Sequence, residues 1–301
     1  MNIVIKVNDE TKQKMIDYYK DKLREKTPPY AIFQAQEEDT IITLYESGKA
    51  MFQGVSADID ANMWGAVIAN DDNSKDEIEK SKYYNVSAVG SDEVGTGDYF
   101  GPIVVTASYV KKEDIKFLED LHVTDSKKIT DDKIIKIAKE ITKKIKYKSI
   151  IITNKEYNEK YSKETNMNKI KAIMHNKALY SLLNEINTKP EYVIIDQFTP
   201  ENKYYDYIKD STNIVKNITF MTKAESKNLA VASSSIISRY IFIKEMDKLS
   251  DKYHTPIPKG SGNNVDKIGE ELVEKYGKEI LDDIAKKNFS NTKKILKTMI
   301  F

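Results

Sequence analysis

The sequence has no cysteine, which excludes disulfide bonds and metal sites built on thiolates. It also lacks long apolar runs: the longest covers a handful of residues, whereas a membrane-spanning helix requires about 20. The N-terminal segment, Met1–Lys6, does not have the long apolar core of a secretory signal. We therefore expect a cytoplasmic protein that does not associate with membranes.

A large excess of charge of one sign is missing as well. The 301 residues carry 48 Lys and Arg against 47 Asp and Glu, a formal net charge of +1. Residues 1–82 have 11 basic against 16 acidic residues, and residues 83–301 have 37 against 31. The second part can attract a polyanion only weakly, so the charge permits a nucleic-acid partner without indicating one.

What is present is a globular composition, with 40% hydrophobic and 32% charged residues, in a chain long enough for two domains. Residues 70–82 are almost wholly polar or charged and show no apolar periodicity, which predicts a linker. We place the domain boundary after it. A small domain with this linker then occupies residues 1–82, and a larger domain occupies residues 83–301.

The first domain has the pattern of a small α+β unit. Its expected elements are a strand at 3–7, a helix at 9–24, strands at 30–36, 40–45 and 50–53, and a helix at 57–68. The three later strands alternate apolar and polar residues, which is typical of an antiparallel meander with one apolar and one polar face. The second helix could cover the apolar face.

In the second domain, strands alternate with helices. Strands are expected at 85–91, 102–110, 149–153, 192–195 and 218–221, and helices at 111–120, 131–144, 167–185 and 223–249. This order predicts an α/β fold with a mixed sheet flanked by helices. Sites in such folds gather at the carboxyl ends of strands.

Acidic residues stand at these strand ends. Asp92 and Glu93 close an apolar run and are followed by a tight turn, Gly95–Gly97, and a second apolar run. Asp196 ends another apolar run, and Glu225 is expected in the first turn of the long helix, where the helix dipole favours an acid. Singly, each acid also fits a structural role at a solvated hairpin, a strand end or a helix cap.

Together, the four acids indicate metal chemistry. Without cysteine or an obvious nucleophile–base pair, hydrolysis of a phosphodiester requires a metal-activated water, and two Mg²⁺ ions about 3.5–4 Å apart can stabilise the attacking and leaving oxygens. Such a centre needs three or four carboxylates. Because consecutive strand residues face opposite sides, Asp92 and Glu93 can serve one site only if the strand bends or ends between them.

Five ordered motifs resemble those of the type 2 ribonuclease H family, and within it ribonuclease HIII. They are SDEVGTGDYFGP at 91–102, DSKK at 125–128, VIIDQF at 193–198, TKAESKNLAVASSSIISRY at 222–240 and PKGSG at 258–262. Residues 30–54 resemble the TATA-binding-protein-like domain that precedes the catalytic domain in ribonuclease HIII. The resemblance thus spans nearly the whole chain.

The resemblance implies a ribonuclease H-like mixed sheet preceded by a small substrate-binding α+β domain. It implies an endoribonuclease that hydrolyses the RNA strand of RNA/DNA hybrids with two divalent ions, Mg²⁺ or Mn²⁺, leaving 5′-phosphate and 3′-hydroxyl ends. Asp92, Glu93, Asp196 and Glu225 match the catalytic, metal-binding acids of the family. The expected partner is an RNA/DNA hybrid duplex, and the protein is expected to be a monomer.

Substrate contacts follow from the same resemblance. The residues expected to touch the hybrid are Gly95, Thr96, Gly97, Lys127, Lys128 and Lys223 in the second domain and Gln34, Tyr45 and Lys49 in the first. Recognition would rest on shape, 2′-hydroxyl groups and phosphates rather than on base sequence. For each lysine taken alone, a solvated side chain is an equal alternative.

Two residues separate this chain from the related ribonucleases HII. Thr96 stands where that family has arginine, and Glu225 where it has aspartate; both match ribonuclease HIII. In ribonucleases HII this arginine serves to recognise the junction between ribonucleotide and DNA. Thr96 therefore disfavours cleavage at a single ribonucleotide embedded in DNA. An HII-type junction ribonuclease and a non-catalytic hybrid-binding protein remain the alternatives. Four acids argue against the second, because they would repel a phosphate.

Other side chains have more modest expected roles. The three histidines (His122, His175 and His254) are expected to be structural, since metal-dependent hydrolysis needs none. The serines at 233–235 fit close packing of a helix on the sheet. Arg239 either pairs with an acid or contacts the backbone of the hybrid.

Overall fold

The computed structural model of the chain describes residues 2–37, 39–54, 57–65, 78, 80–123, 126 and 129–298. The chain divides into two compact units, Met1–Glu79 and Lys80–Phe301. The division falls within the polar stretch at 70–82, most of which lies outside the described residues. No helix in the described ranges is both long enough and apolar enough to cross a bilayer.

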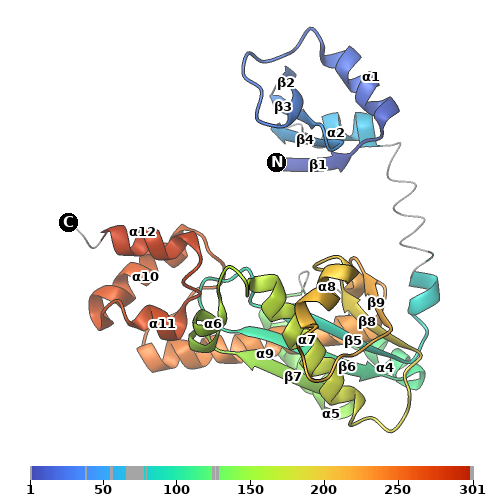
Figure 1. The fold of residues 1–301 in the computed structure, drawn as a ribbon, viewed down its shortest axis with the longest axis vertical. Helices are drawn as coiled ribbons and strands as arrows, with labels where there is room; N and C mark the ends of the chain where they lie inside the picture. The colour runs from blue at the N-terminus through green and yellow to red at the C-terminus, as the bar shows by residue number, and fades with distance from the viewer. Residues whose placement is uncertain are drawn as a thin grey trace. The chain divides into compact units, whose positions relative to one another are not determined.

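The first unit is a four-stranded antiparallel sheet in the order β1-β4-β3-β2, with two helices (Figure 1). Its elements are β1 (Asn2–Lys6), α1 (Asp9–Tyr19), β2 (Ala31–Glu37), β3 (Thr40–Tyr45), β4 (Lys49–Gly54) and α2 (Ala57–Gly65). Because side chains alternate along each strand, Phe33, Ile42 and Phe52 share one face, where they are buried with Met15 and Tyr19 of α1. The predicted meander is confirmed, and β1 joins it beside β4.

Helix α1 ends at Tyr19, before the predicted end near residue 24, because the following segment pairs with β2. Leu23 forms an antiparallel bridge with Ala35, and the backbone N–H of Arg24 donates to the carbonyl of Gln34 at 2.8 Å. Backbone groups that could have continued the helix are therefore satisfied at the sheet edge.

The second unit is built on a five-stranded mixed sheet in the order β7-β6-β5-β8-β9. Its strands are β5 (Ala88–Val94), β6 (Ile103–Val110), β7 (Lys146–Ile152), β8 (Tyr192–Asp196) and β9 (Ile218–Met221). Strand β6 is antiparallel to both β5 and β7, whereas β5, β8 and β9 are parallel. The predicted mixed α/β sheet is confirmed, and the carboxyl ends of β5 and β8 lie side by side.

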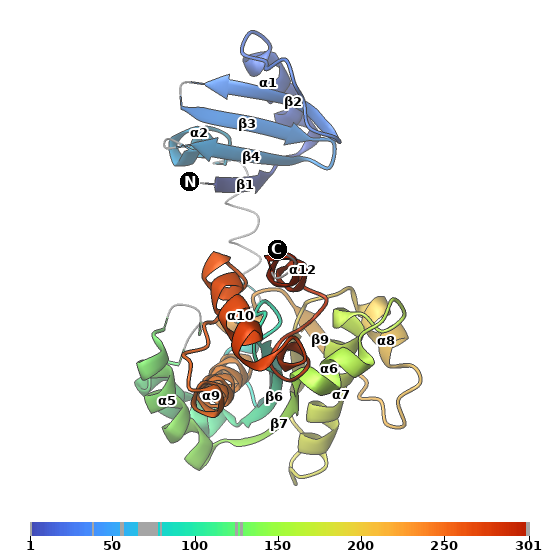
Figure 2. The ribbon, with the colours of Figure 1, turned by 90° about the vertical axis from the view of Figure 1, so that its left-hand side faces the viewer.

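Helices cover both faces of this sheet. The helices of the whole unit are η1 (Lys112–Asp114), α4 (Ile115–Asp120), α5 (Asp131–Lys144), α6 (Asn154–Lys160), α7 (Met167–Leu183), α8 (Glu201–Ile208), η3 (Ala224–Ser226), α9 (Leu229–Tyr253), α10 (Asn263–Tyr276), α11 (Ile280–Ile284) and α12 (Ser290–Thr298). Figure 2 shows α5 and α9 on one side of the strands and α7 and α8 on the other. Two separate apolar cores follow, one under each pair.

Helix α9 lies exceptionally close to β5. A Cβ atom at Gly90 would come within 2.2 Å of the backbone nitrogen of Val231, so only glycine fits there. On the same helix, the hydroxyl of Ser234 is buried and donates to the carbonyl of Gly90 at 2.9 Å. The close helix–sheet packing predicted for the serines at 233–235 is confirmed.

The long helix begins later than predicted. A separate 3₁₀ turn, η3, precedes it, and Asn228 lies between the two. The side chain of Asn228 caps α9 by accepting hydrogen bonds from the backbone nitrogens of Ala230 and Val231. The prediction that Glu225 lies in the first turn of the long helix is therefore wrong, since this residue belongs to η3.

The last three helices, α10 to α12, pack around a further apolar core. The sequence pattern did not predict these helices, nor did it predict α6 and α8. Phe100, Phe242 and Leu281 are buried in this core. Phe100 also forms an isolated antiparallel bridge with Ala285. This core therefore holds the segment that connects β5 to β6.

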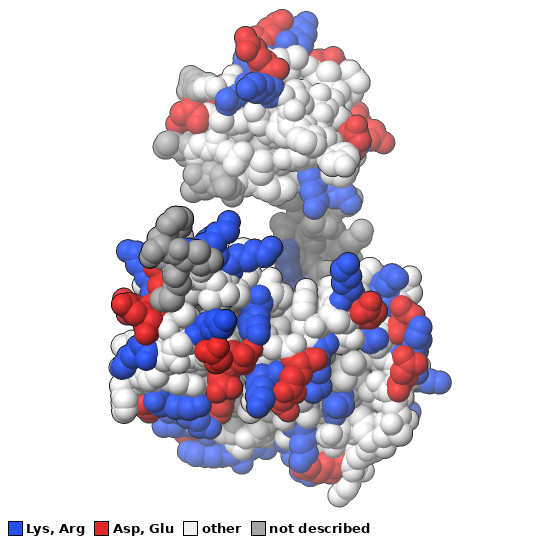
Figure 3. Space-filling model, turned by 60° about the vertical axis from the view of Figure 1, so that its left-hand side comes forward, with Lys and Arg blue, Asp and Glu red and all other residues white. Residues whose placement is uncertain are grey.

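Charges of both signs are mixed on the surface of the second unit. Figure 3 shows Lys and Arg interspersed with Asp and Glu on the face in view. Exposed ion pairs such as Lys148–Glu185 and Lys287–Asp282 link neighbours of opposite sign. This distribution agrees with the weak attraction for a polyanion that the composition indicates.

Candidate active site

A cavity of about 330 Å³ opens where the parallel strands β5 and β8 end. A mixed α/β sheet commonly carries its functional site at this position. The cavity is lined by Asp92, Glu93, Val94, Gly95, Thr96, Ser126, Asp196, Ser235 and Arg239. Three of the four predicted acids and two residues of the predicted glycine turn therefore border one cavity.

Strand β5 continues through both adjacent acids. Asp92 pairs with Thr106 and Glu93 with Val105 of β6, and the strand ends only at Val94. The two acidic side chains consequently leave opposite faces of the sheet. A shared site was expected only if the strand bent or ended between them. The strand does neither, yet both side chains border the same cavity, because the cavity lies at the end of the strand.

Glu93 is held by two side chains of α7. One carboxylate oxygen forms an ion pair with Lys171, and the other lies 2.9 Å from Nε2 of His175. The Nδ1 atom of the same histidine lies 2.5 Å from the hydroxyl of Ser91. Burial opposes ionisation of Glu93, but the hydrogen bonds and charges of His175 and Lys171 outweigh it and lower the pKa to about 2.

Asp92 has the opposite electrostatic environment. Its side chain is buried, and this burial, with the negative charges of Glu93 and Asp196, raises the pKa of Asp92 well above its ordinary value. A hydrogen bond from Ser235 opposes the shift, and Glu225 adds to it. The carboxylate oxygen Oδ1 accepts from the backbone nitrogen of Glu93 at 2.8 Å. Adjacent acids therefore differ sharply in their readiness to ionise.

The other two acids are linked to each other through η3. Asp196 accepts a hydrogen bond from the backbone nitrogen of Ala224 at 2.8 Å, which ties the end of β8 to this turn. Glu225, the next residue, is buried and accepts from the hydroxyl of Ser235 at 3.4 Å. The fold thus brings Asp92, Asp196 and Glu225 into one electrostatically coupled group, although Glu225 does not line the cavity.

The donor set fits a hard divalent cation. All four acids offer only oxygen atoms, the ligands that Mg²⁺ and Mn²⁺ prefer, and a cation would offset the like charges around Asp92. Within the described residues, no three such side chains already form the ligand set of one ion.

Lys171 and His175 were not predicted as site residues, and the expectation that the histidines are purely structural misses the contact of His175 with Glu93. Both are buried on the face of α7 that packs against the sheet, four residues apart. A lysine and a histidine four residues apart on an apolar helix face indicate that the helix packs against a buried acid.

The glycine turn is rigid where it leaves β5 and open at its tip. Gly95 has a positive φ of 96°, and a Cβ atom there would lie 2.2 Å from the carbonyl of Pro102. Gly97 is exposed, with no heavy atom within 4 Å of a Cβ built on it. Asp98 then accepts from the backbone nitrogen of Gly260 at 2.5 Å. The turn is thus anchored on both sides of an accessible backbone.

A buried lysine supports the far end of this turn. Lys286 has no exposed surface, and its ammonium group donates to the carbonyls of Asp98 at 2.7 Å and Gly101 at 2.5 Å. Its backbone nitrogen donates to the carbonyl of Tyr99 at 2.8 Å. Burial, opposed by the charge of Asp98, lowers the pKa of Lys286 to about 7.

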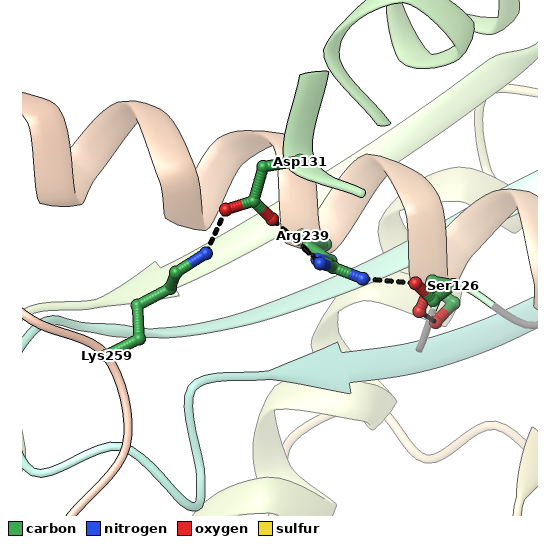
Figure 4. A network of polar contacts seen from close by, with 5 residues as sticks. Ser126, Asp131, Arg239 and Lys259 are labelled. Atoms are coloured by element: carbon green, nitrogen blue, oxygen red, sulfur yellow. Dashed lines mark hydrogen bonds and ion pairs between the residues drawn. The ribbon is translucent and has the colours of Figure 1, made fainter. Parts of the chain in front are cut away.

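Arg239 pairs with an acid. Figure 4 shows the carboxylate of Asp131 between Arg239 and Lys259, and the guanidinium of Arg239 reaching the carbonyl of Ser126. Nη2 of Arg239 lies 2.7 Å from Asp131. Burial opposes ionisation of Asp131, but Lys259 and Arg239 outweigh it and lower the pKa of Asp131. The network joins α5, α9 and the loop before α10 at one side of the cavity.

Among the predicted phosphate contacts, Lys127 and Lys128 lie outside the described residues. Lys223 is exposed and directly precedes η3, with a left-handed φ of 53°. It therefore stands beside Glu225 in sequence but is absent from the lining of the cavity.

The three predicted contacts of the first unit lie on its sheet. Gln34 is half-buried and its side-chain amide donates to the hydroxyl of Thr43 at 3.0 Å. Tyr45 is half-buried, and Lys49 is exposed at the start of β4. These side chains alternate with the buried residues of the same strands, so they lie on the face opposite the helices.

Comparisons with known proteins cover both units. The profile of the family described as Ribonuclease HII matches residues 89–292, and that of a domain of unknown function (DUF3378) matches residues 2–77. A curated Ribonuclease HIII of Bacillus cereus is 42% identical over an alignment of 307 positions that covers 99% of each chain. A Ribonuclease HIII of Bacillus anthracis is likewise 42% identical over 99% of each chain.

Solved structures show the same likeness. A crystal structure of Bst-RNase HIII in complex with Mn²⁺ matches 100% of this chain and 99% of that chain, with a TM-score of 0.72 and 34% identity. The RNase H3 of Aquifex aeolicus matches 96% of this chain and 100% of that chain, with a TM-score of 0.56. At 21% identity, this second match shows a shared fold alone.

Proposed function

The chain belongs to the ribonuclease HIII family, and from this membership we propose that it is an endoribonuclease that hydrolyses the RNA strand of RNA/DNA hybrids. It leaves 5′-phosphate and 3′-hydroxyl ends and uses two divalent ions, Mg²⁺ or Mn²⁺. The observation that carries the proposal is the cavity at the ends of β5 and β8, where three acids and the glycine turn meet. A hybrid-binding protein without catalysis would have no use for buried acids that repel one another.

We assign the metal-binding and catalytic roles to Asp92, Glu93, Asp196 and Glu225. When bound, the two ions activate the attacking water and stabilise the leaving oxygen of the phosphodiester. Asp92 suits a central position because its carboxylate is surrounded by the other acids. Asp196, through its hydrogen bond to Ala224, keeps η3 and therefore Glu225 next to the end of β8.

Substrate binding is assigned to the exposed parts around the cavity and to the first unit. The backbone at Gly95, Thr96 and Gly97 would approach the RNA strand, since the tip of this turn is open. Lys127, Lys128 and Lys223 would contact phosphates. Residues 1–82 would form a TATA-binding-protein-like substrate-binding domain using Gln34, Tyr45 and Lys49, and residues 83–301 the catalytic domain.

The protein is proposed to act as a monomer in the cytoplasm. The chain has no cysteine, so it needs no oxidising environment to form disulfide bonds, and this agrees with a reducing compartment. Size-exclusion chromatography with light scattering would give the mass of the particle. A mass of twice 34.5 kDa would contradict the monomer.

Cleavage of two labelled duplexes in Mg²⁺ tests the function. One carries an all-RNA strand on DNA, and the other is a DNA duplex with a single embedded ribonucleotide. Several cuts in the first and little in the second are expected, and none with Asp92→Asn; Asp210→Asn, at an exposed position, should cut as the natural protein does. Junction cutting would instead favour an HII-type enzyme, and binding without cleavage in either metal would mean a binding protein.

A further inference from the structure

A buried cation beside one of the four acids has no place in the mechanism described so far. Lys171 is buried on α7, with 9% of its side chain exposed, and forms an ion pair with Glu93, whose side chain is 12% exposed. Its ammonium group also lies 4.0 Å from the ring centroid of Phe198, two residues beyond Asp196. The ammonium group is therefore fixed between a carboxylate and an aromatic ring.

This ion pair lies in a position where a divalent cation would need the same carboxylate. Glu93 has two oxygens, and each is already in contact with a side chain of α7: one with Lys171, the other with His175 at 2.9 Å. The ring of His175 stacks on Phe198 with a centroid separation of 5.2 Å. An ion that binds Glu93 must therefore share an oxygen with Lys171 or with His175, or displace one of them, and in each case it lies close to the ammonium group.

We propose that Lys171 is a built-in counter-ion of the acidic site, which competes with divalent cations for Glu93 and thereby limits the affinity of the free protein for metal. The proposal rests on the assignment of Glu93 to the metal site. Charges that are buried must be paired, and Lys171 provides this pairing while the site holds no metal. His175 holds the second oxygen, so that Glu93 keeps its orientation when an ion draws the first oxygen away.

The sign of the effect separates this role from simple structural support. Removing a positive charge within a few ångströms of a cation site strengthens cation binding, because one repulsive interaction disappears. Loss of a structural support would instead loosen Glu93 and weaken binding. Lys171 is a positioning residue in this scheme: it acts on the reaction only through Glu93.

The experiment measures Mn²⁺ binding to the free protein by isothermal titration calorimetry, without nucleic acid. Lys171→Met should bind Mn²⁺ on the order of tenfold more tightly than the natural protein. Lys171→Arg, which keeps the charge, should bind with nearly unchanged affinity. Lys177→Met serves as the control, since Lys177 is exposed on the same helix and its charge lies outside the site.

Unchanged or weaker Mn²⁺ binding by Lys171→Met would overturn the proposal. If that variant does not fold, as judged by circular dichroism, Lys171→Gln removes the same charge while keeping a donor for Glu93, and the same tightening is expected. Asp92→Asn identifies the site that is titrated: it should lose most Mn²⁺ binding. If Asp92→Asn bound Mn²⁺ as the natural protein does, the metal site itself would be misassigned, and the proposed function would fail with it.

Discussion

Replacement of Lys286 by methionine should change the pH dependence of stability in a direction that the structure determines. The natural side chain is fully buried and donates to two carbonyls of the segment between β5 and β6. Burial lowers the pKa of Lys286 to about 7 in the folded protein, from an ordinary value of 10.5. Methionine has a similar length and does not titrate.

The sign follows from the protons bound in each state. Between the folded and the ordinary pKa, the unfolded chain binds one proton more than the folded protein, so the free energy of unfolding rises with pH in this window. Each pKa unit between the folded and the ordinary value corresponds to about 1.4 kcal/mol in the free energy of unfolding, which gives about 4–5 kcal/mol over the whole window. Between about pH 7 and pH 9 the gain is about 2 kcal/mol, because half of the lysine is already neutral at the start.

Urea unfolding at several pH values measures this gain. Trp64 is the only tryptophan and belongs to the first unit, so its fluorescence does not follow the second unit. Far-ultraviolet circular dichroism does, since most helical residues, including α7 and α9, belong to the second unit. The free energy of unfolding of the natural protein should rise relative to that of Lys286→Met by about 2 kcal/mol from pH 7 to pH 9.

Lys287→Met is the matched control, because the neighbouring Lys287 is exposed and pairs with Asp282 at the surface. Its curve of stability against pH should run parallel to that of the natural protein. Parallel curves for Lys286→Met as well would refute the reasoning. They would mean that the two carbonyls keep Lys286 protonated throughout this range in the folded protein.

Three further predictions concern the site and its supports. Asp92→Asn should raise the melting temperature of the metal-free protein, since it removes one of several acids that repel one another. It should also abolish any rise in melting temperature caused by Mn²⁺. A lower melting temperature of the metal-free variant in calorimetry would contradict this. Gly90→Ala should cost on the order of 2–4 kcal/mol in the free energy of unfolding because its Cβ meets Val231, whereas Gly97→Ala, at an open position, should cost almost nothing in urea unfolding. Asp131→Asn should flatten the loss of stability in acid. Because the pKa of Asp131 is lowered in the folded protein, its ionised carboxylate stabilises the fold above the ordinary pKa, and this stabilisation is lost as the pH falls through the folded value. Acid titration followed by circular dichroism would detect the difference.

Much of the fold could be predicted because it depends on local periodicity. The strand at Ile218–Met221 and the helix at Asp131–Lys144 begin and end where the sequence pattern places them. The break before α9 could not be predicted in the same way, since Asn228 was not recognised as a cap inside a long apolar stretch. The short C-terminal helices escaped prediction because they are stabilised mainly by packing on one another and on Phe100, which is distant in sequence.

The acids could be predicted from the sequence because each stands beside a readable boundary of an element. Asp196 ends β8, and Glu225 lies in the turn that precedes α9. The lysines that support the site could not be predicted, since Lys171 meets Glu93, and Lys286 meets the carbonyl of Gly101 beyond the glycine turn, only through contacts between distant segments. The metal-binding role of the four acids and the substrate contacts of Lys127, Lys128 and Lys223 stay predictions.

The two faces of β5 explain how adjacent acids can be tolerated in a folded protein before any metal binds. Placing two carboxylates in sequence on a strand sends them to opposite faces, so each meets a different set of neighbours. Glu93 meets Lys171 and His175 and stays ionised, whereas Asp92 meets other acids and resists ionisation. The repulsion among these acids is therefore reduced because the charge of Glu93 is paired, and the raised pKa of Asp92 makes its carboxyl group accept a proton more readily. A divalent cation held by these acids would favour the ionised form of Asp92, so we expect metal binding to strengthen as the pH rises.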